Sequence, residues 1–215
     1  ISRGVDQLVV SGKVARPDMN GSHQLGVSRT AKGGFEARCN GKNLASAAEL
    51  AAELPIQLVD AHSFSLLEGG PLQRRQFIDW GVFHVEQRFG SMATTFRRTL
   101  EHRNVALRTG SRDLESWTRQ FAVVAEQVHE AREQYVERLK LPLQTALEQL
   151  QGVGGVALRY QPGWDRRRTL QEALAEQLEL DRQSGFTRSG PQRAELRFDI
   201  EGRKAAESLS RGQQK

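Results

Sequence analysis

Residues 66–86 read LLEGGPLQRRQFIDWGVFHVE. Within this stretch the hydrophobic pattern changes from the short alternation of strands to the longer period of helices. Gly69-Gly70-Pro71 puts a proline at a first helical position, where its missing N–H would have no helical partner in any case. The apolar side chains between Phe77 and Val85 leave little polar surface. We therefore expect a helix at the centre of its domain.

The segment that follows is also helical in pattern. Apolar residues between Phe89 and Leu100 are spaced by three and four, and a longer heptad-like series runs from Leu114 to Leu150. Pro142 interrupts that series, and we expect a kink or break there. The series is short for a free coiled coil. It predicts an antiparallel helical subdomain packed on itself, with a helical arm resting on a partner as the alternative.

Both flanks of the helical segment are strand-like. Extended segments at 24–30 and 35–39 are separated by turn signals, and strands are also expected at 56–59, 156–160 and 196–200. Short helices are expected at 46–54 and 170–180. The order of β, then α, then β again predicts an α/β fold, with a helical subdomain inserted into an α/β head.

Composition restricts the class of protein. The chain has 215 residues, of which 38% are hydrophobic and 27% charged, as in globular proteins. No apolar run approaches the roughly 20 residues that span a bilayer, and no signal peptide is recognisable. The single Cys39 excludes a disulfide framework, and the five histidines lack metal-ligand spacing, so no metal site is predicted. We expect a cytoplasmic protein whose ends, beginning with Ile1, look like cuts.

Arginine is concentrated in one part of the chain. Between Pro71 and Arg112 there are eight arginines and three acids, within a net charge of +5 for the whole chain. Such a surplus is typical of a nucleic-acid or phosphate partner, and a solvated helical face is the alternative. The DNA-binding candidates are Arg97, Arg98, Arg103 and Arg108, and then the pair Arg74 and Arg75. For Arg74 and Arg75 the alternative to a DNA contact is a structural ion pair with Asp79.

The last residues combine a helix start with a glycine. Ser210 can cap a helix in which Gln213 reaches back, and Gly212 lets the backbone approach a ligand. Exposed N–H groups at a helix start favour an anion. An ordinary capped surface helix is the alternative.

Four motifs together resemble one family. Leu209-Ser210-Arg211-Gly212-Gln213 resembles the signature motif of ABC ATPases. Residues 66–86 resemble the central motif of the RecF family, 103–108 its following helix, and 190–196 (GPQRAEL) its Gly-Pro segment. The motifs stand in the right order and cover nearly the whole chain. The chain is identified as an internal piece of a bacterial RecF-like protein. An SMC or Rad50 head would carry a far longer coiled coil.

The resemblance implies a division of the chain and a function for the intact parent. Residues 1–68 would be part of an ABC-ATPase head, 69–152 a helical subdomain and 153–215 a return to the head. The parent would bind ATP with Mg²⁺, dimerise around two nucleotides, bind single-stranded or gapped DNA, and help RecO and RecR load RecA. The residues that would meet the γ-phosphate bound by the opposite subunit are Ser210, Arg211, Gly212 and Gln213.

This chain departs from the family in several places. It contains neither a Walker A loop nor a Walker B acid pair, so we expect no catalytic residues, no ATP hydrolysis and no tight nucleotide binding by the piece alone. Glu195 stands where the family usually has Asp, Ala61-His62 occupies the place of the Q-loop, and Gln87 replaces a frequent proline. The competing hypothesis is a non-enzymatic, arginine-rich helical adaptor that binds DNA or protein.

Overall fold

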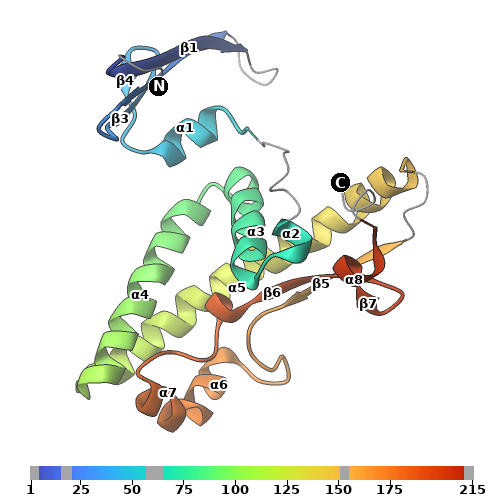
Figure 1. Ribbon diagram of the computed structural model, residues 1–215. Coiled ribbons are helices and arrows are strands. Elements are labelled where there is room, and N and C mark those ends of the chain that lie inside the picture. The colour runs from blue at the N-terminus through green and yellow to red at the C-terminus, as the bar shows by residue number, and fades with distance from the viewer. Residues whose placement is uncertain (1–4, 16–20, 57–64, 151–154, 211–215) are drawn as a thin grey trace. The chain divides into compact units, whose positions relative to one another are not determined.

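The computed structural model describes residues 5–15, 21–56, 65–150 and 155–210. The chain divides into two compact units, Ile1–Leu58 and Val59–Lys215 (Figure 1). None of the described helices is long and apolar enough to cross a membrane.

The first unit is an antiparallel sheet with one helix. Strands β1 (Gln7–Ala15), β2 (Ser22–Thr30), β3 (Phe35–Cys39) and β4 (Lys42–Asn43) pair in that order. The predicted turn at Asn40-Gly41 has positive φ at both residues, 49° and 81°, which suits a tight hairpin. Helix α1 (Ala47–Glu53) contacts β3. The strand expected at 56–59 lies mostly outside the described residues.

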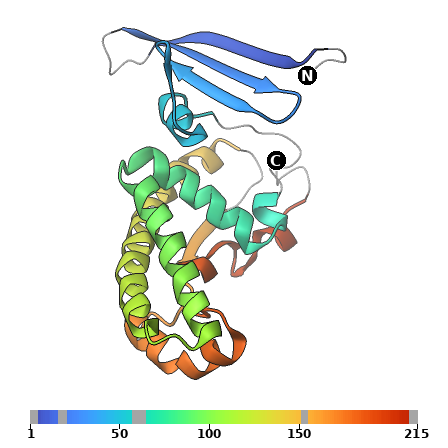
Figure 2. The same cartoon turned by 90° about the vertical axis from the view of Figure 1, so that its left-hand side faces the viewer.

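Helices begin the second unit in the predicted order. They are α2 (Ser65–Glu68), α3 (Pro71–Val85), α4 (Phe89–Thr109) and α5 (Leu114–Glu148). Gly110 ends α4 in the left-handed conformation, and the short turn after it sends α5 back along α4 (Figures 1 and 2). The predicted antiparallel helical packing is therefore confirmed.

Pro142 does not break α5. The helix is continuous from Leu114 to Glu148, so of the expected kink or break the break is wrong, and the kink stays a prediction. Leu139 and Leu143, on either side of the proline, both pack against the hydrophobic core. This packing offsets the roughly 3 kcal/mol that an interior proline costs a helix.

The chain then returns through a small sheet. Strands β5 (Val156–Gln161), β6 (Glu195–Ile200) and β7 (Arg203–Lys204) form an antiparallel sheet in that order. Between β5 and β6 lie α6 (Leu170–Glu176), α7 (Leu178–Ser184) and the 3-10 turn η2 (Pro191–Arg193), so the helix predicted at 170–180 is two short ones. Helix α8 (Ala205–Ser208) follows β7.

One hydrophobic core joins the helices to these strands. Ile78 of α3, Phe121 of α5, Leu158 of β5, Leu170 of α6 and Leu196 of β6 all belong to it, each at most 5% exposed. The α/β class is confirmed. The predicted division at residues 68 and 152 stays a prediction. In this structure the helical segment and the returning strands lie in the same compact unit, Val59–Lys215.

Candidate functional site

The backbone of the Gly-Pro segment (190–196) packs closely against the backbone at Gly163. Gly190 has φ 133°, and a Cβ built on Gly163 (φ 96°) would lie 2.3 Å from the carbonyl oxygen of Gly190. Only glycine allows both that conformation and that approach. The Gln192 side-chain amide donates to the carbonyl of Ser189 at 3.0 Å. The segment therefore has a defined path into β6.

Arg132 of α5 ties this segment to α3. Its Nε and Nη2 donate to Asp79 Oδ1 and Oδ2 at 2.7 and 2.9 Å, and its Nη1 donates to the Pro191 carbonyl at 2.7 Å. Burial by itself lowers the pKa of Arg132, but the hydrogen bonds and charge of Asp79 outweigh it and the pKa is raised. The planar guanidinium suits this two-point contact.

Arg74 and Arg75 hold the other side of the segment. Arg74 Nε and Nη2 donate to both carboxylate oxygens of Glu195, at 2.6 and 2.9 Å. Arg75 donates to the Ala194 carbonyl at 3.0 Å, and burial, followed by the charge of Arg132, lowers the pKa of Arg75. The predicted pairing with Asp79 is wrong, because Arg132 occupies both oxygens of that carboxylate. These contacts leave Arg74 little to offer a phosphate.

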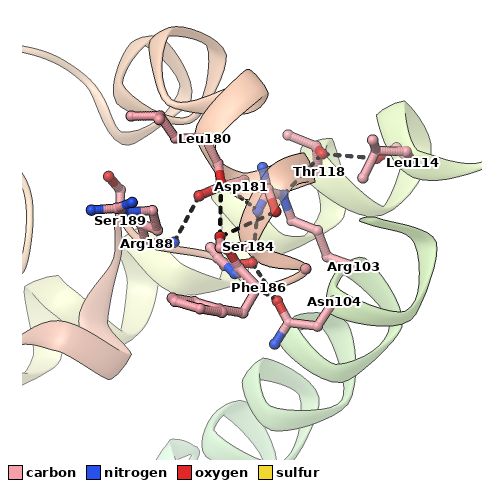
Figure 3. A network of polar contacts seen from close by, with 12 residues as sticks. Arg103, Asn104, Leu114, Thr118, Leu180, Asp181, Ser184, Phe186, Arg188 and Ser189 are labelled. Carbon is pink, nitrogen blue, oxygen red and sulfur yellow. Dashed lines mark hydrogen bonds and ion pairs between the residues drawn. The ribbon is translucent and has the colours of Figure 1, made fainter. Parts of the chain in front are cut away.

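Arg103 is buried and lies within a network of polar contacts (Figure 3). Its Nη1 donates to Asp181 Oδ2 at 2.8 Å and to Thr187 Oγ1 at 2.6 Å, and its Nε donates to Thr118 Oγ1 at 3.1 Å. The Arg103 and Asp181 side chains are both 0% exposed. The expectation that Arg103 contacts DNA is therefore wrong, since the group links α4 to α7 inside the protein. Asp181 lies 78 residues further along the chain, so no local spacing indicated the pair.

Three of the predicted DNA contacts lie on the surface of α4. Arg97, Arg98 and Arg108 are exposed. At about 100° per residue they fall within a sector of about 100° around the helix. Glu101, the one acid of α4, lies in the same sector. The structure thus places three cations and one anion on a single solvent-facing helix surface.

The signature motif lies at the edge of the described chain. Ser210 is exposed and follows α8, and the turn of α8 starts at the buried Ala205. Arg211, Gly212 and Gln213 lie outside the described residues, as does the Ala61-His62 loop. The capping geometry expected for Ser210 and Gln213 is therefore not tested.

A groove of about 860 Å³ lies on the opposite side of α4 from Arg97 and Arg108. Val82, Met92 and Val124 contribute apolar lining. The charged lining residues are of both signs, so the groove does not select one class of ligand. These residues are Glu86, Arg88, Arg119, Glu130 and Arg138.

One group of side chains in the described residues could hold a metal ion. His23, Cys39 and Glu53, all in the first unit, bring three ligand atoms within 4.8 Å of one another. They stand 14 to 30 residues apart, and the sequence offered no ligand spacing to find them.

Comparison with known proteins places this fold. No family model matches the sequence. The DNA replication and repair protein RecF of Stutzerimonas stutzeri is 46% identical over 209 residues, which is 96% of this chain and 56% of that protein. RecF of Pseudomonas putida is 46% identical over 198 residues, 91% of this chain and 54% of that protein. The chain thus spans about half the length of these relatives.

Solved structures agree at the level of the fold. The structure of the recombination mediator protein RecF-ATP in the RecFOR pathway superposes with a TM-score of 0.85 at 20% identity. It matches 100% of this chain, which covers 61% of that chain. A second structure, RecF-ATPrS, gives a TM-score of 0.84. Over the part of those proteins that it spans, the chain matches RecF, the DNA replication and repair protein, in sequence and in fold.

Proposed function

We propose that the whole protein carrying this chain is an ATP-dependent DNA-binding protein of recombinational repair and replication. The observation that carries the proposal is 46% identity over 209 residues to a protein named for DNA replication and repair. The RecFOR pathway named for the matching RecF structure favours RecO and RecR as partners, with loading of RecA as the outcome. ATP would enter with Mg²⁺, held by carboxylates and a phosphate loop that this chain does not contain.

Ser210, Arg211, Gly212 and Gln213 would contact the γ-phosphate of a nucleotide held by a second copy. The exposure of Ser210 supports this role. The segment that leads to the motif is also held in place. Arg74 donates two hydrogen bonds to Glu195 at the start of β6, and the chain then continues through β7 to α8. A hydroxyl and a glycine at a helix start suit a phosphate.

DNA binding would rest on the α4 surface formed by Arg97, Arg98 and Arg108. Arginine on an open helical face neutralises backbone phosphates and carries little sequence information. Single-stranded or gapped DNA offers that backbone with few other constraints. The fixed arginines Arg74, Arg75 and Arg103 would then support the fold that presents this surface.

Substitution of Ser210 tests the nucleotide role. Ser210→Trp in the full-length protein is expected to abolish ATP-driven dimerisation, measured by analytical ultracentrifugation, because the indole fills the space of the phosphate. Ser116→Trp, on the exposed surface of α5, is the matched control and should dimerise as the parent does. Unchanged dimerisation of the Ser210 variant would show that the signature assignment is wrong.

Salt dependence tests the DNA role. Each phosphate contact contributes about −0.9 to the slope of log K against log salt, so changing Arg97, Arg98 and Arg108 to Gln together should flatten the slope by about 2.7 on duplex regions. A control carries the same change at three exposed arginines outside α4, namely Arg119, Arg167 and Arg182. An equal slope in both variants would remove α4 from the DNA site. If DNA affinity were the same with and without ATP, the hypothesis of a non-enzymatic adaptor would be favoured instead.

A further inference from the structure

The first unit gathers a nitrogen, a sulfur and an oxygen ligand on the inner face of its sheet. Leu25 of β2 pairs with Cys39 of β3, and side chains two residues apart on a strand share a face, so His23 lies on the same face as both. Helix α1 contacts β3 and ends at Glu53. Three elements thus deliver His23, Cys39 and Glu53 to one point.

The distances among these groups fit an ion between them. His23 Nδ1 lies 2.8 Å from Glu53 Oε2 and 3.9 Å from Cys39 Sγ, and all three ligand atoms lie within 4.8 Å of one another. Zinc with ordinary bond lengths and tetrahedral angles would hold nitrogen about 3.4 Å from oxygen and about 3.6 Å from sulfur. The nitrogen–oxygen distance is thus about 0.6 Å shorter and the nitrogen–sulfur distance about 0.3 Å longer than these values, so binding an ion requires small rearrangements of the three side chains.

Two of the contacts in the cluster converge on one nitrogen. Glu53 and Cys39 both approach the same nitrogen, Nδ1 of His23, which carries at most one proton. Glu53 also stands in the last turn of α1, which contains no basic residue. A carboxylate there faces the negative end of the helix dipole. A metal ion bonded to Nδ1 would satisfy both neighbours and neutralise that carboxylate.

We propose that His23, Cys39 and Glu53 form a binding site for a Zn²⁺-class transition-metal ion. The thiolate and imidazole select such an ion over Mg²⁺, which prefers oxygen ligands, so this site is distinct from the Mg²⁺ that accompanies a nucleotide. The His23 and Glu53 side chains are 25% and 30% exposed, which leaves water access for a fourth ligand. Binding deprotonates the thiol and releases a proton to solvent.

The site would strengthen a unit that has few buried apolar side chains. Leu25 and Ala37 are the buried hydrophobic residues of its described part, and β1 exposes Leu8, Val9 and Val10. Small units of this kind often depend on a metal to join their elements. Here the ion would join α1 to β2 and β3, independently of ATP or DNA.

Metal uptake by the full-length, nucleotide-free protein tests the proposal. Co²⁺ should produce a thiolate-to-metal charge-transfer band that disappears in Cys39→Ser. Zn²⁺ affinity, measured by competition with a chelating dye, should fall at least about tenfold in His23→Gln and in Glu53→Gln. Glu36→Gln is the matched control, since it removes the same charge from an exposed position on β3, and its affinity should equal that of the parent.

A second measurement needs no variant. Zn²⁺ should slow alkylation of Cys39 in the parent protein at least about tenfold, followed by mass spectrometry of the Cys39 peptide, because a coordinated thiolate is a poor nucleophile. The assignment would be overturned if Zn²⁺ left the alkylation rate of Cys39 unchanged. It would also be overturned if the Co²⁺ thiolate band persisted in Cys39→Ser.

Discussion

Replacing Arg103 by Met isolates the contribution of the buried pair between α4 and α7. Methionine keeps much of the length of the side chain but removes its charge and its hydrogen bonds to Asp181, Thr187 and Thr118. Among the described residues, the donor left to the Asp181 carboxylate would be the Arg188 N–H, which lies 3.0 Å from Oδ1. A buried carboxylate is left without its cation.

The magnitude follows from that burial. Both side chains are 0% exposed, so no solvent screens the loss. Removing one partner of a buried ion pair costs about 3–5 kcal/mol. For a unit of this size, each kcal/mol lowers the melting temperature by about 2–4 °C, so the variant should melt about 6–20 °C lower. Adding Asp181→Leu should recover part of the loss, because the uncompensated charge is then gone.

Thermal and urea unfolding of the full-length protein, followed by circular dichroism, measure this effect. Arg97→Met is the control, an exposed arginine on the same helix, and should change stability by no more than about 0.5 kcal/mol. If Arg103→Met instead unfolded like the parent and weakened DNA binding, the internal role derived from the structure would be refuted and the DNA role restored.

Two further predictions concern the same unit. Gly163→Ala should destabilise the fold by about 2–6 kcal/mol, because of backbone strain at φ 96° and the clash of the new Cβ with the Gly190 carbonyl. Gly155→Ala is the control, since a Cβ there would have nothing within 4 Å, and it should be nearly neutral. Urea unfolding measures both. Burial, followed by the charge of Arg166, lowers the pKa of His129, so the unfolded chain takes up a proton near its usual 6.5 before the folded chain does. The free energy of unfolding should therefore fall as pH drops below about 6.5, and His129→Gln should make that fall shallower. If the unfolding free energy of the parent did not change between pH 7 and 5, the prediction would be contradicted.

Local signals predicted the elements well. Pro71 after two glycines marked the start of α3, and the spacing of Phe89, Met92 and Phe96 marked α4. Pro142 misled, because the rule for proline describes the backbone, whereas the core contacts of Leu139 and Leu143 decided the outcome. Packing between distant segments was not visible in the pattern.

The site was less predictable than the elements. The sequence does not distinguish buried from exposed arginines within a cluster, yet Arg103 is buried while Arg97 and Arg98 are exposed. What separates them is the position of an acid 78 residues away, which spacing does not reveal. The same holds for His23 and Glu53, 30 residues apart, whose meeting depends on how α1 lies on the sheet.

The ion pair between Arg74 and Glu195 cannot form until late in synthesis. The two residues are 121 positions apart, and at about 5–20 residues per second the ribosome needs roughly 6–24 s to make the chain between them. Until then Ile78 and Val82 have no β6 to cover them, although α4 and α5 can already associate as a local hairpin. We therefore expect the nascent chain to expose apolar surface for seconds, the condition under which unfinished domains bind chaperones.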